Sequence, residues 1–257
     1  MAFLEVRGVE HTYVLKKQRI EALKGIDMSV EEKSFVTILG PSGCGKSTLL
    51  RLIAGLEMPT KGEIYLEGRR VEGPGSDRGM VFQSYTLFPW LTVKENIEFG
   101  LVLKGMSRAE REEISSHFIS ITGLSGFEDY YPKNLSGGMQ QRVAIARALA
   151  NDPEVLLMDE PFGALDAQTR MLMQEFLLRL WQDSHKTILF VTHDIEEAIF
   201  LGDFIFVMTS RPGRFKKIVE IDIPRPRDFD IKVSPEFTEM KKELYDMIRE
   251  ETLGADR

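Results

Sequence analysis

Several features that would assign a chain to a class of protein are scarce or missing from this sequence of 257 residues. It has a single cysteine, Cys44, which excludes an internal disulfide bond and fits a reducing compartment. No apolar run approaches the roughly 18 residues that span a bilayer. The N-terminus has no basic stretch followed by an apolar one, so we expect no signal peptide. If the chain works at a membrane, we expect a partner to hold it there.

An excess of positive charge is also missing. Lys and Arg total 33 against 40 Asp and Glu, which gives a formal net charge of -7. A net acidic chain is poorly suited to sequence-independent binding of nucleic acid, so we expect no nucleic-acid partner. Hydrophobic residues make up 43% of the chain, which is enough for one large domain, or for one domain with a small lobe.

Strand and helix patterns alternate along the chain. Residues 1–34 alternate apolar and polar positions as half-exposed strands do, and residues 35–39 form the continuous apolar run of a strand buried on both faces. Further strands are predicted at 64–66, 79–82, 155–158, 187–191 and 204–208, and helices at 46–56 and 166–181. This alternation predicts an α/β fold with a mostly parallel sheet that helices cover on both faces.

Two stretches depart from the alternation. Residues 87–150 are mainly helical, with a capping box at Ser107 and Glu110, and we interpret them as an inserted helical subdomain. Residues 233–257 form a tail with Pro235 at the first position of a predicted helix. Its apolar face would consist of Phe237, Met240, Leu244, Met247 and Ile248.

One glycine-rich motif lies between the buried strand and the helix that follows it. It consists of Gly40, Pro41, Ser42, Gly43, Cys44, Gly45, Lys46 and Ser47, with Thr48 next, and matches G-x-x-x-x-G-K-[ST]. Glycines let the backbone bring several N–H groups close to phosphate oxygens, and the helix presents its positive end to the same anion. We expect Lys46 to reach the β- and γ-phosphates of ATP and Ser47 to ligate Mg²⁺, whereas Cys44 contributes only its backbone. The motif predicts a P-loop NTPase core, against the alternative of a glycine-rich turn without a ligand.

Two carboxylates follow the apolar strand at 155–158. The C-terminal edge of a parallel sheet is where α/β proteins bind ligands, and Asp159 and Glu160 emerge there. Asp159 is suited to hold Mg²⁺ through its water shell, and Glu160 to polarise the attacking water. Taken alone, an acidic junction between strand and loop is common, and the phosphate motif is what favours the catalytic interpretation.

A second helix start then suggests a family. Residues 135–142 read LSGGMQQR, which resembles the LSGGQ signature of ABC ATPases with Met139 in place of Gln. Ser136, Gly137 and Gly138 precede an amphipathic helix whose N-terminus can hold an anion. One chain with one phosphate loop has no obvious use for a second anion site, but a homodimer does. Each signature could close on the γ-phosphate held by the opposite protomer.

The resemblance assigns roles to further residues. It implies that Gln83 ligates Mg²⁺ and links it to the helical subdomain, and that Asp166 crosses the dimer interface. It also implies that His193 senses the γ-phosphate and supports Glu160, and that Tyr13 stacks on adenine. Each of these residue types taken alone has an ordinary structural explanation, and their order and spacing relative to the phosphate motif favours the functional one. The implied architecture is an ABC ATPase domain over residues 1–232, with an N-terminal antiparallel β-subdomain and the helical insertion at about 87–150.

Two segments narrow the resemblance. Residues 87–93 (LFPWLTV) and 208–214 (MTSRPGR) resemble the ATPase subunits of bacterial importers for nitrate, sulfonates and taurine. The resemblance implies membrane permease subunits that dock near Leu87, Phe88 and Trp90. It also implies an indirect link to a surface or periplasmic substrate-binding protein, and a peripheral place on the cytoplasmic face of the membrane. Against this, Trp90 could simply pack in the core of the helical subdomain.

About forty residues follow Arg214, too few for the regulatory domain of roughly a hundred residues that sugar importers often carry, so we expect no such domain. A soluble ABC ATPase of an assembly machine, such as that for iron–sulfur clusters, is the main alternative. A DNA-repair ATPase is disfavoured because no coiled coil or zinc-ligand insertion fits, and a regulator without turnover because every hydrolytic residue is present. The sequence does not identify the transported molecule.

Overall fold

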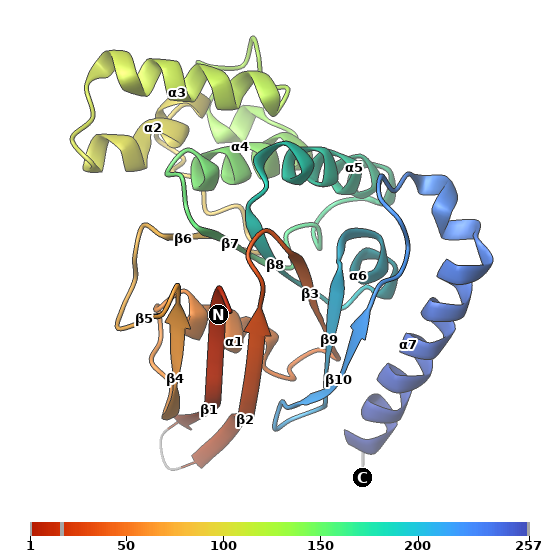
Figure 1. The fold of residues 1–257 in the computed structure, drawn as a ribbon. Helices are drawn as coiled ribbons and strands as arrows, with labels where there is room; N and C mark the ends of the chain where they lie inside the picture. Colours follow the sequence, from red (N-terminus) through yellow and green to blue (C-terminus); the bar gives the residue numbers. More distant parts are fainter. Residues whose placement is uncertain (1, 16–17, 256–257) are drawn as a thin grey trace. The chain divides into compact units, whose positions relative to one another are not determined.

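A computed structural model describes residues 2–15 and 18–255 of the chain (Figure 1). The chain divides into two compact units: Met1–Gly75 with Lys186–Arg257, and Ser76–His185. Within the described residues, no helix combines the length and the apolar character that a bilayer crossing requires.

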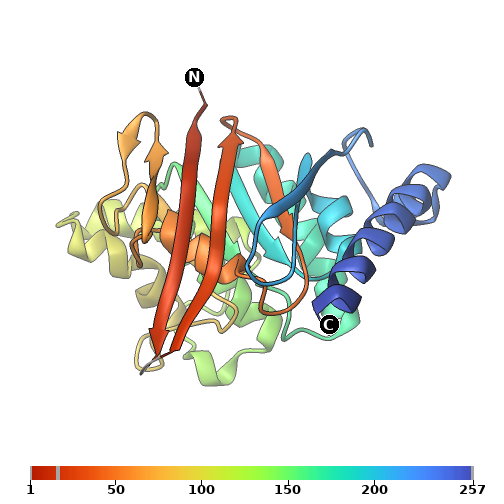
Figure 2. The ribbon, with the colours of Figure 1, turned by 90° about the horizontal axis from the view of Figure 1, so that it is seen from below.

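An antiparallel sheet opens the first unit (Figure 2). Its strands are β1 (Leu4–Leu15), β2 (Gln18–Val30), β4 (Lys61–Leu66) and β5 (Arg69–Arg70), in the order β2-β1-β4-β5. The alternating apolar residues all turn to the buried side, as the pattern predicts: Phe3, Val6, Val9, Ile26, Met28 and Val30. The expected N-terminal antiparallel β-subdomain is therefore confirmed.

The second sheet of this unit is built around β3 (Phe35–Leu39), every residue of which is buried. It pairs in parallel with β8 (Thr187–Thr192) and β9 (Phe204–Met208), and β10 (Phe215–Glu220) adds to β9 in antiparallel orientation. Helix α1 (Lys46–Ile53) follows β3 and is shorter than the predicted 46–56, because the chain turns at Gly55 with φ +72°. The sheet is thus mostly parallel, as expected, with one antiparallel edge strand.

The first unit ends in two helical segments after α6 (Ile195–Leu201), β9 and β10. They are a 3-10 turn, η2 (Phe229–Val233), and the long helix α7 (Pro235–Ala255), which packs against α6 (Figures 1 and 2). Ser234 Oγ accepts a hydrogen bond from Phe237 N at 3.2 Å and so caps α7 at its start. Of the predicted apolar face, Phe237 and Leu244 are fully buried, and the other three residues are half-buried.

The second unit combines two parallel strands with four helices: β6 (Arg78–Val81), β7 (Val155–Asp159), α2 (Val93–Leu103), α3 (Arg108–Ile121), α4 (Gly137–Leu149) and α5 (Ala167–Ser184). A short 3-10 turn, η1 (Pro132–Asn134), precedes α4. The predicted capping box at Ser107 and Glu110 is present, and Thr92 with Glu95 forms a second one at the start of α2. Helices α2, α3 and α4 enclose a hydrophobic cluster that includes Val93, Ile97, Ile119, Leu124 and Val143.

Asn96, a fully buried polar residue of α2, holds the loop that precedes this helix. Its Oδ1 accepts from Phe88 N at 2.9 Å, and its Nδ2 donates to the carbonyl oxygens of Phe88 (3.2 Å), Leu91 (3.0 Å) and Thr92 (2.9 Å). One amide side chain thus satisfies four backbone groups of residues 88–92, which could not all reach water.

We expect Asn96→Ala to lower the free energy of unfolding by about 2–3 kcal/mol, because Phe88 N–H and the Leu91 carbonyl lose their partner in a part-buried loop. Urea denaturation measures the loss. The matched control is Glu95→Gln, an exposed neighbour that keeps its capping oxygen and should change stability by less than about 0.5 kcal/mol. Equal stability of both variants would show that the loop does not depend on Asn96.

Candidate active site

The phosphate loop, residues 40–47, connects β3 to α1 in the first unit. Gly43 and Gly45 have φ angles of +76° and +109°, in the left-handed region that favours glycine. A Cβ at Gly45 would lie 2.7 Å from Leu23 Cδ2, so a side chain has no room there. The backbone therefore turns tightly just before the helix, which leaves the loop N–H groups and the N-terminus of α1 to bind an anion.

Lys46 lies over this loop and is 4% exposed. Its Nζ donates to the carbonyl oxygens of Gly40 at 2.9 Å and Pro41 at 3.0 Å. The Ser47 side chain is half-buried beside it, and the Cys44 side chain is buried. The loop thus combines a fixed cation with a hydroxyl, the two groups expected for a phosphate with its metal ion.

Tyr13 of β1 lies beside the same helix. Its hydroxyl donates to Glu57 Oε2 at 2.7 Å and lies 3.2 Å from Thr48 Oγ1, the residue after the phosphate loop. His11 meets the Tyr13 ring edge-on, with the ring centroids 4.6 Å apart. Burial is the main cause that raises the pKa of Tyr13. The ring is therefore attached to α1, and Glu57 is a positioning residue that the sequence analysis did not identify.

His193 follows β8 and is exposed. Strands β3 and β8 run parallel with Leu39 opposite Thr192, so Gly40 and His193 leave neighbouring strands at the same edge of the sheet. In the first unit, the phosphate loop thus lies near Tyr13 through Thr48, and it shares a sheet edge with His193.

The same arrangement recurs in the second unit. Strands β6 and β7 run parallel with Val81 opposite Met158, so Gln83 and the pair Asp159–Glu160 emerge from neighbouring strand ends. Asp159 is 6% exposed, and Glu160 is half-buried. Both carboxylates therefore belong to one sheet edge together with the predicted glutamine.

Glu160 has a φ of +43°, a left-handed conformation that costs a non-glycine residue about 1 kcal/mol. Its carbonyl accepts from Gly163 N at 3.1 Å, which closes a tight turn. A Cβ at Gly163 would lie 3.7 Å from Gln83 Nε2, so the glutamine amide lies close to this turn. Backbone strain of this kind is frequent at functional sites, although five other described non-glycine residues also have a positive φ.

Ser136 caps helix α4. Its Oγ accepts from Met139 N at 3.3 Å, and the first turn of the helix holds no acidic residue. The N-terminus therefore keeps its affinity for an anion. The Met139 side chain packs against the hydrophobic cluster of the helices and so belongs to the core of this unit.

The two signature glycines are closely packed. A Cβ at Gly137 would lie 2.8 Å from Tyr85 Oη, and one at Gly138 would lie 2.7 Å from Thr169 Cγ2 of α5. Asp166 caps α5 by accepting from Thr169 N at 3.0 Å. Hydrogen bonding to Thr169, first through its side chain and then through its backbone N–H, lowers the pKa of Asp166. The second unit thus brings the signature next to the first turn of the helix that Asp166 begins.

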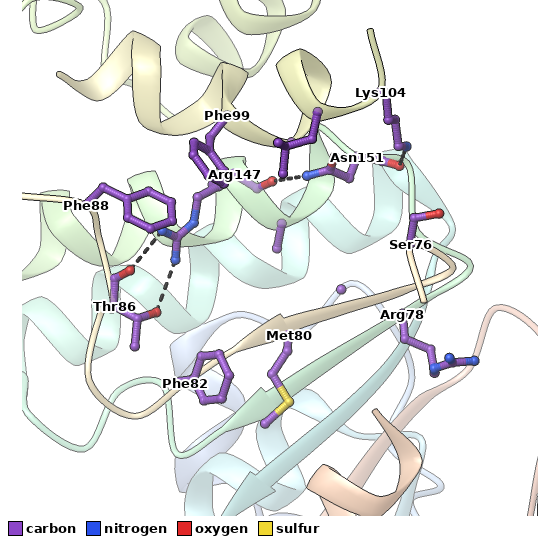
Figure 3. Close-up of a pocket in the computed structure, with 14 residues that line it drawn as sticks. Ser76, Arg78, Met80, Phe82, Thr86, Phe88, Phe99, Lys104, Arg147 and Asn151 are labelled. Carbon is purple, nitrogen blue, oxygen red and sulfur yellow. Dashed lines mark hydrogen bonds between the residues drawn. The ribbon is translucent and has the colours of Figure 1, made fainter. Parts of the chain in front are cut away.

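A pocket of about 640 Å³ opens in the second unit between β6, α2 and α4 (Figure 3). Its apolar wall includes Phe88, whose ring centroid lies 4.4 Å from that of Phe99 and 5.6 Å from that of Trp90. Trp90 is 69% exposed, so the alternative that it packs in the helical core is wrong. At the two ends of residues 87–93, Leu87 packs against the core cluster and Val93 belongs to it.

Arg147 of α4 points into this pocket, and the sequence analysis did not identify it (Figure 3). Its guanidinium donates to the carbonyl oxygen of Thr86 at 2.9 Å and to Thr86 Oγ1 at 3.1 Å, and its Cζ lies 5.4 Å from the Phe88 ring centroid. Burial lowers the pKa of Arg147. One arginine therefore attaches the segment after Gln83 to the helix that begins at the signature.

Comparisons with known proteins agree with these features. Residues 23–163 match the model of a family described as "ABC transporter". The chain is 55% identical over 98% of its length to an uncharacterized ABC transporter ATP-binding protein of Methanocaldococcus jannaschii, covering 93% of that protein. It is 50% identical to the nitrate import ATP-binding protein NrtD of Synechocystis, with 96% of this chain and 95% of NrtD covered. It is 46% identical to the aliphatic sulfonates import ATP-binding protein SsuB of Bacillus cereus, with 94% of each covered.

Solved structures give the same fold. A dimeric ATP-binding cassette in a post-hydrolysis state with ADP and Pi matches with a TM-score of 0.75 at 37% identity, over 88% of this chain and 100% of that one. The structure of cbiO1 from Clostridium perfringens, part of an ABC transporter complex, matches with a TM-score of 0.76 at 29% identity, over 85% of this chain and 88% of that one. The expected α/β architecture with a P-loop core is confirmed.

The packing at Gly45 gives a direct test of the phosphate loop. We expect Gly45→Ala to weaken binding of a fluorescent ATP analogue at least about tenfold, because the new methyl group would push the loop away from Leu23. Gly68→Ala is the matched control, since Gly68 also has a positive φ of +73° but nothing within 4 Å of the added Cβ. If Gly45→Ala binds as well as Gly68→Ala, residues 40–47 are not the phosphate site.

Proposed function

The chain belongs to the ABC transporter family of ATP-binding proteins, and from this premise we propose that it powers a membrane importer of nitrate, a sulfonate or a similar small molecule. The chain is an ATPase. The observation that carries the proposal is the likeness to nitrate and sulfonate import ATP-binding proteins over nearly the whole chain. Two further segments resemble the same importer ATPases. Residues 87–93 lie between Gln83 and the signature, and residues 208–214 follow His193.

Nucleotide binding follows from the first unit. The adenine ring stacks on Tyr13, whose hydroxyl is fixed by Glu57, and the phosphates lie on the loop N–H groups with Lys46 beside them. Because Tyr13 is bonded to α1 near Thr48, the base anchor and the phosphate loop keep a constant separation. Such pre-organisation lowers the entropic cost of binding.

The second anion site implies a dimer. Ser136, Gly137 and Gly138 of one protomer would close on the γ-phosphate held by the phosphate loop of the other, with Asp166 at the interface. This is supported by the positive end of α4, whose first turn holds no acidic residue, and by the dimeric form of the related cassette MJ0796.

Mg²⁺ fits the available oxygen donors: the Ser47 hydroxyl, the Gln83 amide oxygen and the Asp159 carboxylate. Oxygen ligands of this kind are those that Mg²⁺ prefers, and it usually keeps several waters and binds substrate phosphates as well. When bound, Mg²⁺ neutralises the charge that develops on the phosphate oxygens.

Hydrolysis requires a positioned water. Glu160, held by its left-handed backbone conformation, orients and polarises this water, and His193 supports it next to the γ-phosphate.

The permease partner would dock at the pocket beside Phe88. The apolar wall at Phe88, with the exposed ring of Trp90 next to Phe88, suits a helix or loop of a membrane subunit. Docking there places the chain at the cytoplasmic face of the membrane, in indirect contact with a substrate-binding protein. Arg147 connects this pocket to the signature helix, so docking and phosphate binding share one helix.

The alternative, a soluble ATPase of an assembly machine, is not favoured by the relatives found. Co-purification distinguishes the two, because an importer subunit is recovered with a membrane protein and an assembly ATPase with a soluble scaffold.

We expect Glu160→Gln to bind ATP within about twofold of the unaltered chain but to lose at least about 100-fold in turnover. It should also shift the chain to a stable dimer with ATP on size-exclusion chromatography. Glu154→Gln is the control, because this exposed glutamate begins the same strand region and carries no proposed role. Full turnover in Glu160→Gln would remove Glu160 from the reaction.

We expect Trp90→Ala to weaken association with the membrane partner by about 30-fold, since exposed aromatic anchors dominate interfaces. The measurement is recovery of the permease with the tagged chain from detergent-solubilised membranes. Tyr245→Ala of α7, another exposed aromatic at 56%, should leave recovery unchanged. Equal recovery with both variants would place the docking site elsewhere.

A further inference from the structure

Helix α6 directly follows the predicted phosphate sensor His193 and has seven residues. So short a helix is unstable alone, because few of its hydrogen bonds are internal and both ends leave backbone groups unpaired. The C-terminal segment after β10 packs beside α6 through α7 (Figure 1), and its side chains bond to both ends of this helix.

Arg227 closes the C-terminal end. Its guanidinium is 7% exposed and donates to the carbonyl oxygens of Ile199 (2.9 Å), Phe200 (3.2 Å) and Gly202 (2.6 Å), and also to that of Ile223 (2.9 Å). Burial lowers its pKa to about 10, so the group remains charged at neutral pH. A cation bonded to the last carbonyls of a helix is favourable both as a cap and toward the helix dipole.

Lysines of the same segment hold the first turn of α6. Lys241 of α7 pairs with Glu196 Oε1 at 2.5 Å, and Lys232 lies 3.7 Å from Glu196 Oε2. The Lys232 ammonium also lies 5.1 Å from the Phe200 ring centroid and 4.5 Å from that of Phe229. The pairing with Lys241 is the main cause that lowers the pKa of Glu196.

The first turn of α6 in turn fixes the backbone on both sides of His193. Asp194 Oδ1 accepts from Glu196 N at 2.8 Å and Glu197 N at 3.2 Å, and Thr192 Oγ1 donates to Glu197 Oε2 at 2.7 Å. Thr192 and Asp194 are also joined to each other, at 2.9 Å. A shift of α6 therefore moves the residues that flank His193.

We propose that Arg227 and Lys241 are positioning residues for His193, through which the C-terminal segment sets the rate of ATP hydrolysis. The inference rests on the proposed role of His193. It goes beyond that role because it assigns part of turnover control to residues far from the phosphate motifs. A purely stabilising tail would change the unfolding midpoint and leave kcat per folded molecule unchanged.

Two ion pairs of α7 provide a matched test. Lys241–Glu196 (2.5 Å) connects α7 to α6, and Lys217–Glu243 (2.6 Å) connects it to β10, with side-chain exposures of 49% and 39% against 50% and 46%. We expect Lys241→Ala to lower kcat about two- to fivefold with KM for ATP unchanged, and Lys217→Ala to leave both constants unchanged. Thermal unfolding of both full-length variants should shift equally.

A conservative variant supplies the rescue. Lys241→Arg, which keeps a positive charge opposite Glu196, should retain most of kcat, whereas Lys241→Glu should not. Arg227→Met should reduce kcat at least about tenfold, and Arg227→Lys by less, since one ammonium reaches fewer of the carbonyls. Because loss of a buried arginine can unfold the chain, the exposed Lys241 pair carries the test.

Two outcomes separate this inference from the proposed function. If His193→Ala abolishes turnover but Lys241→Ala and Lys217→Ala keep equal kcat and the Arg227 variants change only the unfolding midpoint, the inference is wrong and the role of His193 stands. If His193→Ala itself retains full turnover, the role of His193 is wrong and the inference fails with it.

Discussion

Parallel strand register is the constraint on which the rest of this structure depends. Opposite Leu39 lies Thr192, and opposite Val81 lies Met158, so in each unit the residues after two strands leave from a common edge. The arrangement does not depend on separation in the sequence: Gly40 and His193 lie at one edge of the sheet because β3 and β8 pair. Because these strands are apolar, they are buried in the core of the sheet. The polar residues that follow them therefore lie at its C-terminal edge.

Helix termini add the second layer of organisation. The phosphate loop ends at the N-terminus of α1, the signature forms that of α4, and Asp166 forms that of α5. Positive helix ends and fixed backbone N–H groups bind anions without a titrating side chain, which makes them insensitive to moderate changes in pH. Helix α4 begins with the signature glycines, and near its other end Arg147 bonds to the segment after Gln83.

The sequence predicts what is local. The phosphate motif, the strands at 35–39 and 155–158 and the capping box at Ser107 are defined by residues a few positions apart, and the structure has each of them. Residues joined across large separations were not predicted: Arg147 meets Thr86 over 61 positions, and Arg227 meets Ile199 over 28. The sequence does not distinguish a buried arginine from a solvent-exposed one, and only the fold shows which carbonyl groups surround it. The exposure of Trp90 also required the structure, since the sequence could not distinguish an exposed ring from one packed in the helical core. The roles of Glu160, His193 and the other site residues remain predictions.

The carbonyl cap that Arg227 provides lies well beyond residue 163, where the match to the family model stops. Two proteins with identical nucleotide motifs could therefore differ in catalytic speed through their tails alone. The rate of ATP hydrolysis could then evolve through residues that do not contact the nucleotide. Substitutions there would adjust how fast an importer consumes ATP while every residue that touches the nucleotide stays the same.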